Sequence, residues 1–544
     1  MQIPVLTLAG AAGIVAFSAA LLRIIPADWV QGGLRVWRRV AAERMAPAYV
    51  GLLALVSRLA LLPFFPIPRP VIADEFSYLL LGETLASGKL VNPAHHLWPH
   101  FETLFVLSQP VYASVYPLMQ GLTLGLGIAA TGEPWWGVWL SAGLMCAAIC
   151  WMLRGWMPPA WALFGGCLAS LQLGIFGYWM NSFWGGCPAA IGGALVFGAL
   201  PRMERGRNVG DALTCGAGLA ILANSRPYEG FVLALPAAVW WVGRWLRLAA
   251  PERVLAIKTQ ALPLLAVLVI TAIADGCYFW RVTGSPFRMP YQAYIEQYAA
   301  APAFVWQREP PIPVYRHEVL RDAHLAFRID YRQSRSAIGF TRLTLKKLGQ
   351  LAGFYLGPLW LIPLLMLPGL VRIKRIRLLL ISAGIGLAGL ALAAPFWPHY
   401  AAPMAGIIFA LAVESLRLLS MMRRQGLNIG RYLIPAAPLV CLFGAFVSFD
   451  PSHFHSRVTR RPALVASLQQ TGPSHLVFVH YGSHHALGEE WVYNAPDIDA
   501  APIVWARDMG DARNEELLRY FPRRTSWLLD PDEDPPRLTP YRAR

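Results

Sequence analysis

Charged residues are scarce in this sequence of 544 residues, in which 14% are Asp, Glu, Lys or Arg and 56% are hydrophobic. A soluble globular protein carries roughly 25% charged residues. The deficit leaves long stretches without a water-facing side, and several of them reach the ~20 apolar residues that a helix needs to cross a bilayer. The composition therefore argues against a soluble protein and predicts a polytopic integral membrane protein.

Other signals are missing as well. The seven cysteines lie in or beside apolar segments without any CxxC pair, so we interpret them as packing residues. The net charge of +16 comes without RNA-binding aromatic motifs or zinc-finger spacings. Because the basic residues gather at the ends of apolar segments, we expect membrane lipid, and no nucleic acid, as a partner.

Thirteen apolar segments are candidates for membrane spans. They fall at about 4–22, 47–65, 112–130, 136–153, 160–178, 183–200, 209–223, 229–247, 261–280, 350–370, 378–394, 401–418 and 432–448. Strict alternation of all of them conflicts with cytoplasmic placement of the short basic connections. The conflict disappears if 112–130 does not cross, which leaves about 12 transmembrane helices; a crossing there, with a miscount elsewhere, is the alternative.

With this topology, nearly all unusual polar motifs fall on the outer side. The outer connections are 66–111, 179–186, 224–228, the long loop 281–349, 395–400 and the tail from about 449. We predict an all-α transmembrane domain over 1–448 and a small α/β extracytoplasmic domain over 449–544. In the tail, the patterns predict helices at 462–470 and 514–521 and strands at 476–481, 503–507 and 526–529.

The first outer loop contains two adjacent acids, Asp74 and Glu75, just beyond the span that ends near residue 65. Carboxylates at a membrane edge are costly to desolvate, so such a pair is a candidate for function. Helical spacing places Tyr78 one turn away on the same side. On the residues alone, a solvated loop with a helix N-cap at Asp74 fits equally well.

The turn 224–229 contains a basic residue between two predicted spans. The planar guanidinium of Arg226 is suited to a two-pronged contact with phosphate, and Tyr228 lies beside it. An ion pair between Arg226 and Glu229 that closes the turn is an equally good interpretation.

Two more outer segments combine aromatic and polar residues. In 181–186, Asn181 and Trp184 can contact a sugar ring, although an interfacial Trp anchor is at least as good a reading. The long loop carries several Tyr and Trp residues and many arginines, most of which we expect on anionic lipid or in water. These arginines are Arg288, Arg308, Arg316, Arg321, Arg328, Arg332, Arg335 and Arg342.

Histidines gather in the first outer loop, where His95, His96 and His100 lie near Glu102, and again in the tail. Neutral histidine is a common metal ligand, but this spacing fits no standard closed site. We therefore expect no metal site and no cofactor, with a divalent cation as the alternative.

An acidic pair in the first outer loop, followed by Tyr78, resembles the GT-C superfamily of lipid-dependent glycosyltransferases. The resemblance is greatest to the protein O-mannosyltransferases and the aminoarabinose transferases of bacterial lipid A, which have Pro-Asp-Glu followed by a Tyr. Here Ala73 replaces the proline. The later pair Tyr116-Pro117 resembles the approach of that family to its next span.

A second motif, 398–403, resembles the Tyr-to-Pro motif that opens a late span of the same superfamily. The family often has a basic residue before the Tyr, whereas this sequence has His399 before Tyr400. The resemblance covers roughly residues 47–420 at the level of architecture.

The resemblance implies a glycosyltransferase at the outer face of the plasma (inner) membrane. A polyprenyl-phosphate or polyprenyl-diphosphate sugar would be the donor, and a glycan, lipid or protein hydroxyl would attack with inversion. Asp74 would be the general base, and Glu75 would orient it, raise its pKa by like-charge proximity or bind the acceptor. Cations would stabilise the leaving phosphate. The alternative is a transporter or flippase for a lipid-linked or anionic solute, which sparse mid-span charges and the lack of an internal repeat disfavour.

Overall fold

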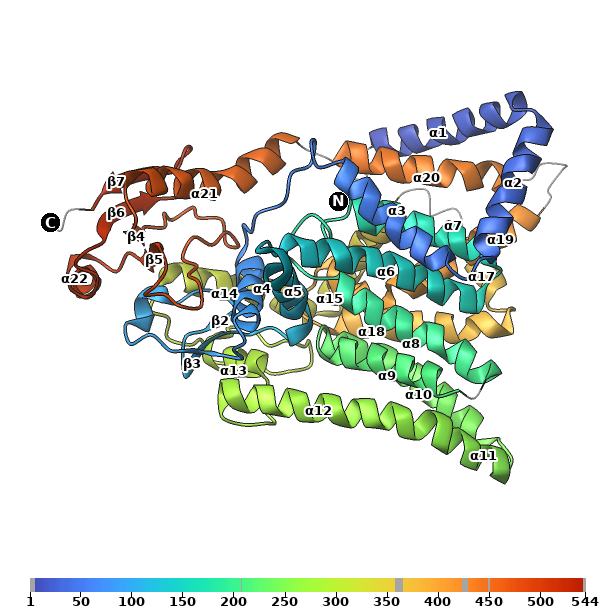
Figure 1. Cartoon of the computed structure of the whole chain (residues 1–544), viewed down its shortest axis with the longest axis horizontal. Helices are drawn as coiled ribbons and strands as arrows, with labels where there is room; N and C mark the ends of the chain where they lie inside the picture. The colour runs from blue at the N-terminus through green and yellow to red at the C-terminus, as the bar shows by residue number, and fades with distance from the viewer. Residues whose placement is uncertain (1–4, 207, 358–364, 423–428, 449–450, 542–544) are drawn as a thin grey trace.

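The computed structural model describes residues 5–206, 208–357, 365–422, 429–448 and 451–541. Its larger part is a bundle of helices that run side by side, with the C-terminal sheet at one end (Figure 1). The bundle helices are α1 (Val5–Ile24), α3 (Ala46–Ala60), α6 (Trp135–Trp156), α7 (Pro159–Ala169), α8 (Cys187–Arg205), α9 (Val209–Ala223), α10 (Pro227–Leu246), α12 (Leu262–Thr283), α18 (Arg377–Leu392), α19 (Ala405–Met421) and α20 (Ile429–Ser448).

Small residues bring the bundle helices close together. Gly192 of α8 faces Gly218 of α9, and a Cβ atom on Gly192 would lie 2.9 Å from the Gly218 carbonyl oxygen. Such close approach maximises van der Waals contact, which holds helices together where water provides no hydrophobic driving force. The apolar, glycine-rich composition of these segments thus explains both their helical form and their packing.

Several of these helices have the dimensions of membrane spans. In the described part of the chain, four are long and apolar enough, namely Trp135–Trp156, Ala250–Thr283, Lys374–Leu392 and Pro398–Met421. A fifth arises if α2 (Ala27–Ala42) and α3, which are bent by 106° at a short break, form one span. The chain is therefore a multi-pass membrane protein by composition and length, and the expected count of about 12 spans stays a prediction.

The segment 112–130 was expected not to cross. It contains part of a short strand, β3 (Val111–Ser114), followed by the 14-residue helix α5 (Leu118–Thr131). At about 1.5 Å per residue, α5 is about 21 Å long, which is shorter than a ~30 Å hydrocarbon core. Its neighbours are α4 (Ala73–Ala86) and α6, so it lies between the first outer loop and the bundle.

The predicted outer connections meet at the end of the bundle that carries the C-terminal sheet (Figure 1). In the first loop, α4 precedes a small antiparallel sheet of β1 (Asn92–Pro93), β3 and β2 (Val106–Leu107), in that order. The long loop adds helices α13 (Pro290–Tyr298), α14 (Glu318–Ser334) and α15 (Ala337–Leu351).

The remaining short helices are α11 (Ala250–Ala256) and α17 (Leu367–Leu370). Single turns of tighter or wider helix, labelled η, extend several of the longer helices, and η7 (Pro398–Met404) leads into α19. The predicted span 350–370 lies partly outside the described residues, because 358–364 are not described.

The C-terminal domain is a small α/β unit, as expected. Helix α21 (Pro451–Thr471) leads into β4 (His475–Val479), β5 (Ile503–Arg507), α22 (Asp511–Tyr520), β6 (Thr525–Asp530) and β7 (Arg537–Pro540). The sheet order is β5-β4-β6-β7; β4 is parallel to both β5 and β6, and β7 is antiparallel to β6. β4 and β5 are buried along their whole length, as parallel strands usually are.

The strand and helix predictions in this domain are confirmed, with two differences. The helix predicted from 462 begins eleven residues earlier, since Pro462 lies inside α21 rather than at its first turn. A proline is most favourable at the first turn, which is why the sequence suggested a start there. Strand β7 was missed because Pro540 and the surrounding polar residues give no alternating pattern.

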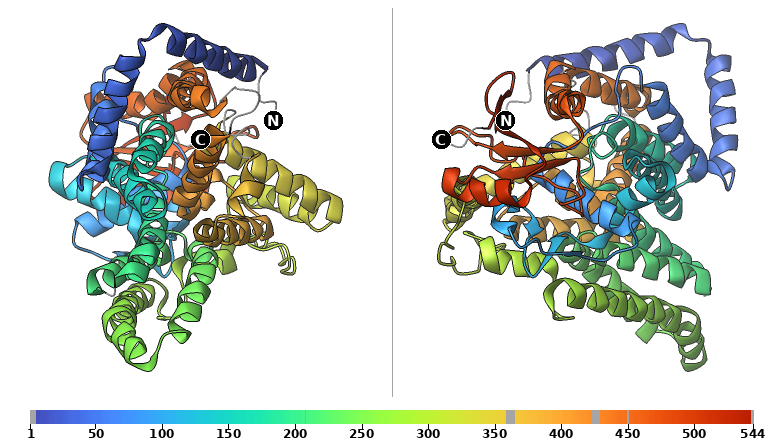
Figure 2. Two further views of the ribbon diagram at one scale, coloured as in Figure 1. Left: turned by 90° about the vertical axis from the view of Figure 1, so that its right-hand side faces the viewer. Right: turned by 60° about the vertical axis from the view of Figure 1, so that its left-hand side comes forward.

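The C-terminal domain shares a hydrophobic core with the first outer loop. Phe76 and Leu80 of α4 pack in one buried cluster with Leu476 of β4, Val504 of β5 and Leu517 of α22. Each such fully buried side chain contributes about 1.5–3 kcal/mol relative to exposure. In Figure 2 the sheet lies against the first loop, so the domain is docked at the end of the bundle where α4 begins.

Candidate active site

The acidic pair lies in the first turn of α4, where the helix dipole favours negative charge. Asp74 is partly accessible, whereas Glu75 is 5% exposed. The two neighbouring carboxylates therefore have different surroundings, which allows them to have different roles.

Both carboxylate oxygens of Glu75 accept backbone hydrogen bonds. Oε2 accepts from the N–H groups of Val71 (3.0 Å) and Ile72 (3.3 Å), and Oε1 accepts from the N–H of Phe183 (2.9 Å). Burial raises the pKa of Glu75 and these backbone donors lower it, with a net upward shift. Glu75 thus ties the start of α4 to the 181–186 turn.

Asp74 is bonded by a side chain that sequence reasoning did not place in the site. The hydroxyl of Tyr116 donates to Oδ1 of Asp74 over 2.5 Å. Burial raises the pKa of Asp74 above its ordinary value, while Tyr116, the charge of Arg226 and a bond from the Trp184 side chain oppose this rise. A carboxylate with a raised pKa is a stronger proton acceptor than an exposed aspartate.

Tyr78 lies one turn along α4 from the acidic pair, at the position that the helical spacing gave it. Its ring stacks on Tyr116 with centroids 4.3 Å apart and an interplanar angle of 19°. Only 6% of Tyr78 is exposed, so the stack forms one wall of the site. Tyr291 from the long loop stacks in turn on Tyr116, with centroids 6.4 Å apart.

Arg226 immediately precedes α10 and faces the same cluster. Its guanidinium carbon lies 3.9 Å from the ring centroid of Tyr400, and its Nη1 lies 4.0 Å from Oε1 of Glu229. The separation of Arg226 and Glu229 is thus at the upper limit for an ion pair. The positive charge of Arg226 also acts on Asp74. Both interpretations of the 224–229 turn therefore stay open, because the loose pair leaves donors available for an anion.

His399 lies next to Tyr400 at the start of the late helix. The Nδ1 atom of His399 is 2.9 Å from the hydroxyl of Tyr178, and its ring meets Trp184 edge-on with centroids 4.5 Å apart. His399 is 2% exposed. The structure thus brings Trp184, His399, Tyr400 and Arg226 into one group around Asp74.

Two of the predicted binding residues have other contacts. The Asn181 side chain accepts from Arg58 Nε (2.9 Å) and donates to the carbonyls of Ile175 and Gly177. Tyr228 donates to the Gly389 carbonyl of α18 over 3.1 Å. These bonds join helices to each other, which indicates a structural role for both residues.

A small cavity opens among these groups. It is lined by Tyr78, Pro117, Gln120, Gly185, Gly186, Pro188, Ala189, Ser225 and Arg226. The lining includes Pro117, Gly186 and Arg226, which immediately precede α5, α8 and α10, so three helix N-termini meet there. Positive ends of helix dipoles together with Arg226 favour an anion. The cavity holds about 20 Å³, so an entering phosphate must displace some of the lining side chains.

The arginines of the long loop mostly form ion pairs with nearby acids. Arg328 and Arg332 both bond Glu309, and Arg288 bonds Glu296 over 2.5 Å. The expectation that most of the loop's arginines lie in water or on lipid stays a prediction.

His95 and Glu102 of the first loop bond to other segments. His95 lies 3.1 Å from Asp499 of the tail, and Glu102 accepts a bond from Tyr298 over 2.6 Å. Across the described ranges, no group of three or more His, Cys, Asp or Glu residues is arranged to hold a metal ion.

In comparisons with known proteins, the matches are to solved structures. No family model matches the sequence, and no curated protein matches it significantly. ArnT from Cupriavidus metallidurans, bound to undecaprenyl phosphate, aligns over 88% of this chain and 93% of its own at 13% identity, with a TM-score of 0.48.

The Archaeoglobus fulgidus oligosaccharyltransferase tethered to an acceptor peptide aligns over 81% of this chain and 62% of its own, at 10% identity and a TM-score of 0.46. The oligosaccharyltransferase AglB from the same organism, in complex with an inhibitory peptide and a dolichol-phosphate, aligns over 89% and 69% at 9% identity, with a TM-score of 0.42. All of these neighbours are glycosyltransferases of the GT-C superfamily, which the motifs of this sequence resemble.

Proposed function

We propose that this chain is a membrane glycosyltransferase that moves a sugar from a polyprenyl-phosphate or polyprenyl-diphosphate donor to an acceptor hydroxyl at the outer face of the membrane. The observation that carries the proposal is the joint placement of Asp74, Tyr116 and Arg226 at one end of an apolar helical bundle. A proton acceptor and a cation lie together at the end of the bundle where we place the lipid head groups.

Asp74 is the proposed general base. As the acceptor hydroxyl attacks the anomeric carbon on the face opposite the phosphate, its proton passes to Asp74, and the configuration inverts. The raised pKa of Asp74 makes it a stronger base than an exposed aspartate. Glu75, whose oxygens are occupied by backbone donors, orients α4 rather than taking the proton.

Arg226 is the proposed partner of the leaving phosphate. Negative charge grows on the phosphate oxygens as the glycosidic bond breaks, and a fixed guanidinium stabilises that charge without reorganisation. The helix N-termini around the adjacent cavity add partial positive charge. Trp184 and Tyr78 provide aromatic faces against which a sugar ring can pack.

The test compares envelope glycans and glycolipids by mass spectrometry in strains with the intact gene, a deletion, and the deletion carrying Asp74→Asn at normal abundance. We expect a sugar to disappear on deletion and to stay absent with Asp74→Asn. Glu83→Gln is the matched control, since it makes the same acid-to-amide change in α4 away from the cluster, and should restore the sugar. Full restoration by Asp74→Asn would rule out Asp74 as the base.

A deletion that leaves the glycans and the lipid-linked precursors unchanged would refute the transferase function itself. In that case the transporter alternative could be tested next, by following the distribution of lipid-linked precursors between the two leaflets.

A further inference from the structure

A short backbone pairing connects the C-terminal domain to the residues that precede the acidic pair. Ile72 and Glu489 are antiparallel bridge partners. The N–H of Ala73 donates to the Gly488 carbonyl (3.0 Å), and the N–H of Glu490 donates to the Val71 carbonyl (3.2 Å). We call residues 71–73 and 488–490 together the clasp. Because Asp74 follows directly, the clasp fixes the chain where the site begins.

The same segment is bonded from the side of the acidic pair. The N–H of Val71 donates to Glu75, while the carbonyl of Val71 accepts from Glu490. The position of the first turn of α4 therefore depends on two sets of bonds, one within the first loop and one to the C-terminal domain.

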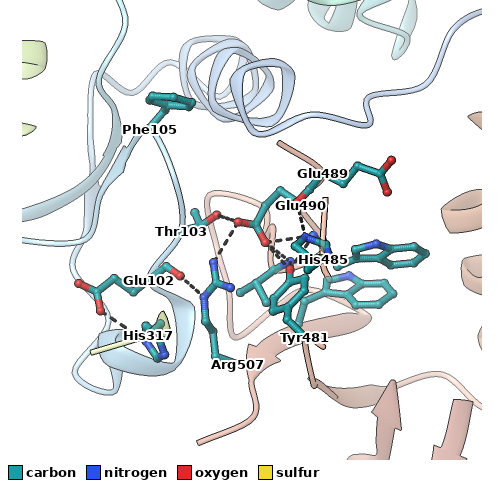
Figure 3. A network of polar contacts seen from close by, with 12 residues as sticks. Glu102, Thr103, Phe105, His317, Tyr481, His485, Glu489, Glu490 and Arg507 are labelled. Atoms are coloured by element: carbon teal, nitrogen blue, oxygen red, sulfur yellow. Dashed lines mark hydrogen bonds and ion pairs between the residues drawn. The ribbon is translucent and has the colours of Figure 1, made fainter. Parts of the chain in front are cut away.

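The Glu490 side chain anchors the clasp within a buried polar network (Figure 3). Its carboxylate accepts from Tyr481 (2.5 Å), Thr103 (2.6 Å) and Arg507 (2.9 Å). Burial raises the pKa of Glu490, but Arg507 and the hydroxyl donors outweigh this effect and hold the pKa below its ordinary value. Glu490 is thus a fully buried, ionised group with partners on both sides of the interface.

Arg507 extends the network to the other outer segments. Its Nε donates to the Glu102 carbonyl over 2.6 Å, and the Glu102 side chain accepts from Tyr298 of the long loop. His317, also from the long loop, lies 3.4 Å from the same carboxylate. Three segments that are far apart in sequence meet at this point, as Figure 3 shows for Glu102, His317 and Arg507.

From these contacts we infer that the C-terminal domain is a positioning element of the transfer site, and that Glu490 and Arg507 are positioning residues that act on Asp74 through the clasp. The inference rests on the proposed function for the chemistry at Asp74, whereas the clasp itself is a structural claim. A domain that only adds stability or only binds the acceptor would not need to hold the backbone next to the base.

The first experiment measures hydrogen–deuterium exchange of the full-length protein in detergent, without any substrate. In Glu490→Gln, the amides of residues 71–75 should exchange about tenfold faster or more, because the charge that holds Arg507 and Thr103 is lost. Arg519→Ala is the control, since Arg519 lies in the same domain with a side chain 71% exposed. Unchanged exchange at 71–75 in a folded Glu490→Gln protein would overturn the inference.

The second experiment removes a single bond of the clasp. Proline is well accepted at the first position of a helix, and Ile72 has the extended backbone (φ −99°, ψ 155°) that a following proline requires. Ala73→Pro therefore leaves α4 intact but removes the N–H that donates to Gly488. Ala73→Gly, which keeps this N–H, is the matched control.

The transfer rate is measured in isolated membranes with increasing amounts of lipid extract from the deletion strain as the donor. We expect kcat to fall at least about tenfold in Ala73→Pro with KM for the donor within about twofold, and Ala73→Gly to behave like the unchanged chain. A kcat that does not fall in Ala73→Pro would overturn the inference. If Asp74→Asn is active while the exchange data show the loosened clasp, the proposed function fails and the clasp stands.

Discussion

Replacing Tyr116 by phenylalanine should raise the pKa of Asp74, because the Tyr116 hydroxyl donates to Asp74 over 2.5 Å and stabilises the ionised form. A hydrogen bond to a charged group contributes about 1.5–3 kcal/mol. Since a shift of one pKa unit corresponds to about 1.4 kcal/mol, the pKa should rise by about 1–2 units. The phenyl ring keeps the stack on Tyr78, so the change is confined to the hydroxyl.

The assay is the pH dependence of the transfer rate in isolated membranes. Asp74 must be ionised to accept a proton, so the rate falls as the pH drops through its pKa. In Tyr116→Phe this acidic limb should lie about 1–2 pH units higher, following the pKa change worked out above.

Tyr291→Phe is the matched control, because it removes a hydroxyl from the same aromatic stack and leaves the bond between Tyr116 and Asp74 in place. An unmoved acidic limb in Tyr116→Phe, or an equal shift in Tyr291→Phe, would refute this account of the base.

Three further changes test other parts of the structure. Arg226→Lys should lower the transfer rate about tenfold or more at equal abundance on immunoblots, because an ammonium group cannot make the planar contact of a guanidinium with phosphate; an unchanged rate would remove Arg226 from the site. Glu83→Gln should raise Tm at pH 8 but not at pH 5. Burial raises the pKa of Glu83 to about 7, so Glu83 is still protonated in the native state at pH values where it is ionised in the unfolded chain. The native state therefore loses about 3 kcal/mol of stability as the pH rises to about 7, and glutamine avoids this loss. An equal effect of Glu83→Gln on Tm at both pH values would contradict this. Arg58→Met should lower Tm in detergent, because Arg58 is 1% exposed and its loss leaves Asn181 and two carbonyls without a donor, which costs on the order of 3 kcal/mol.

Much of the candidate site could be predicted from sequence because its residues lie in short polar turns between apolar segments. Asp74, Arg226, Trp184 and Tyr400 stand out in this way, and the positive-inside rule placed their turns at one end of the bundle. The structure brings them together there, through contacts such as that of Arg226 with Tyr400.

Other features of the site leave no trace in the pattern of residues. Tyr116 was noticed only for its neighbouring proline, since nothing in a linear sequence indicates that a tyrosine 42 residues further on bonds Asp74. Asn181 and Tyr228 stand in polar turns like the others, yet their side chains bond backbone carbonyls of the bundle. The turn predicts that a side chain is near the site and does not determine which way it points.

The pairing in the clasp could not be predicted from the sequence, because its bonds join backbone groups that every residue except proline carries. Only the departure at Ala73, where the resembling family has proline, gave a signal. The Ala73 N–H is used in the structure to bond Gly488. The alanine was visible in the sequence, but only the three-dimensional structure shows that its N–H forms a bond that proline could not form.

The distance along the chain between the two halves of the clasp has a consequence for biosynthesis. Ala73 and Gly488, whose backbone groups bond in the clasp, are 415 residues apart, so the first loop is synthesised long before its partner has been translated. On the inference drawn above, the acidic pair is correctly placed only after the C-terminal domain has folded against it. A chain whose synthesis stops before residue 488 would insert into the membrane and stay inactive, so incomplete molecules would not consume donor lipid.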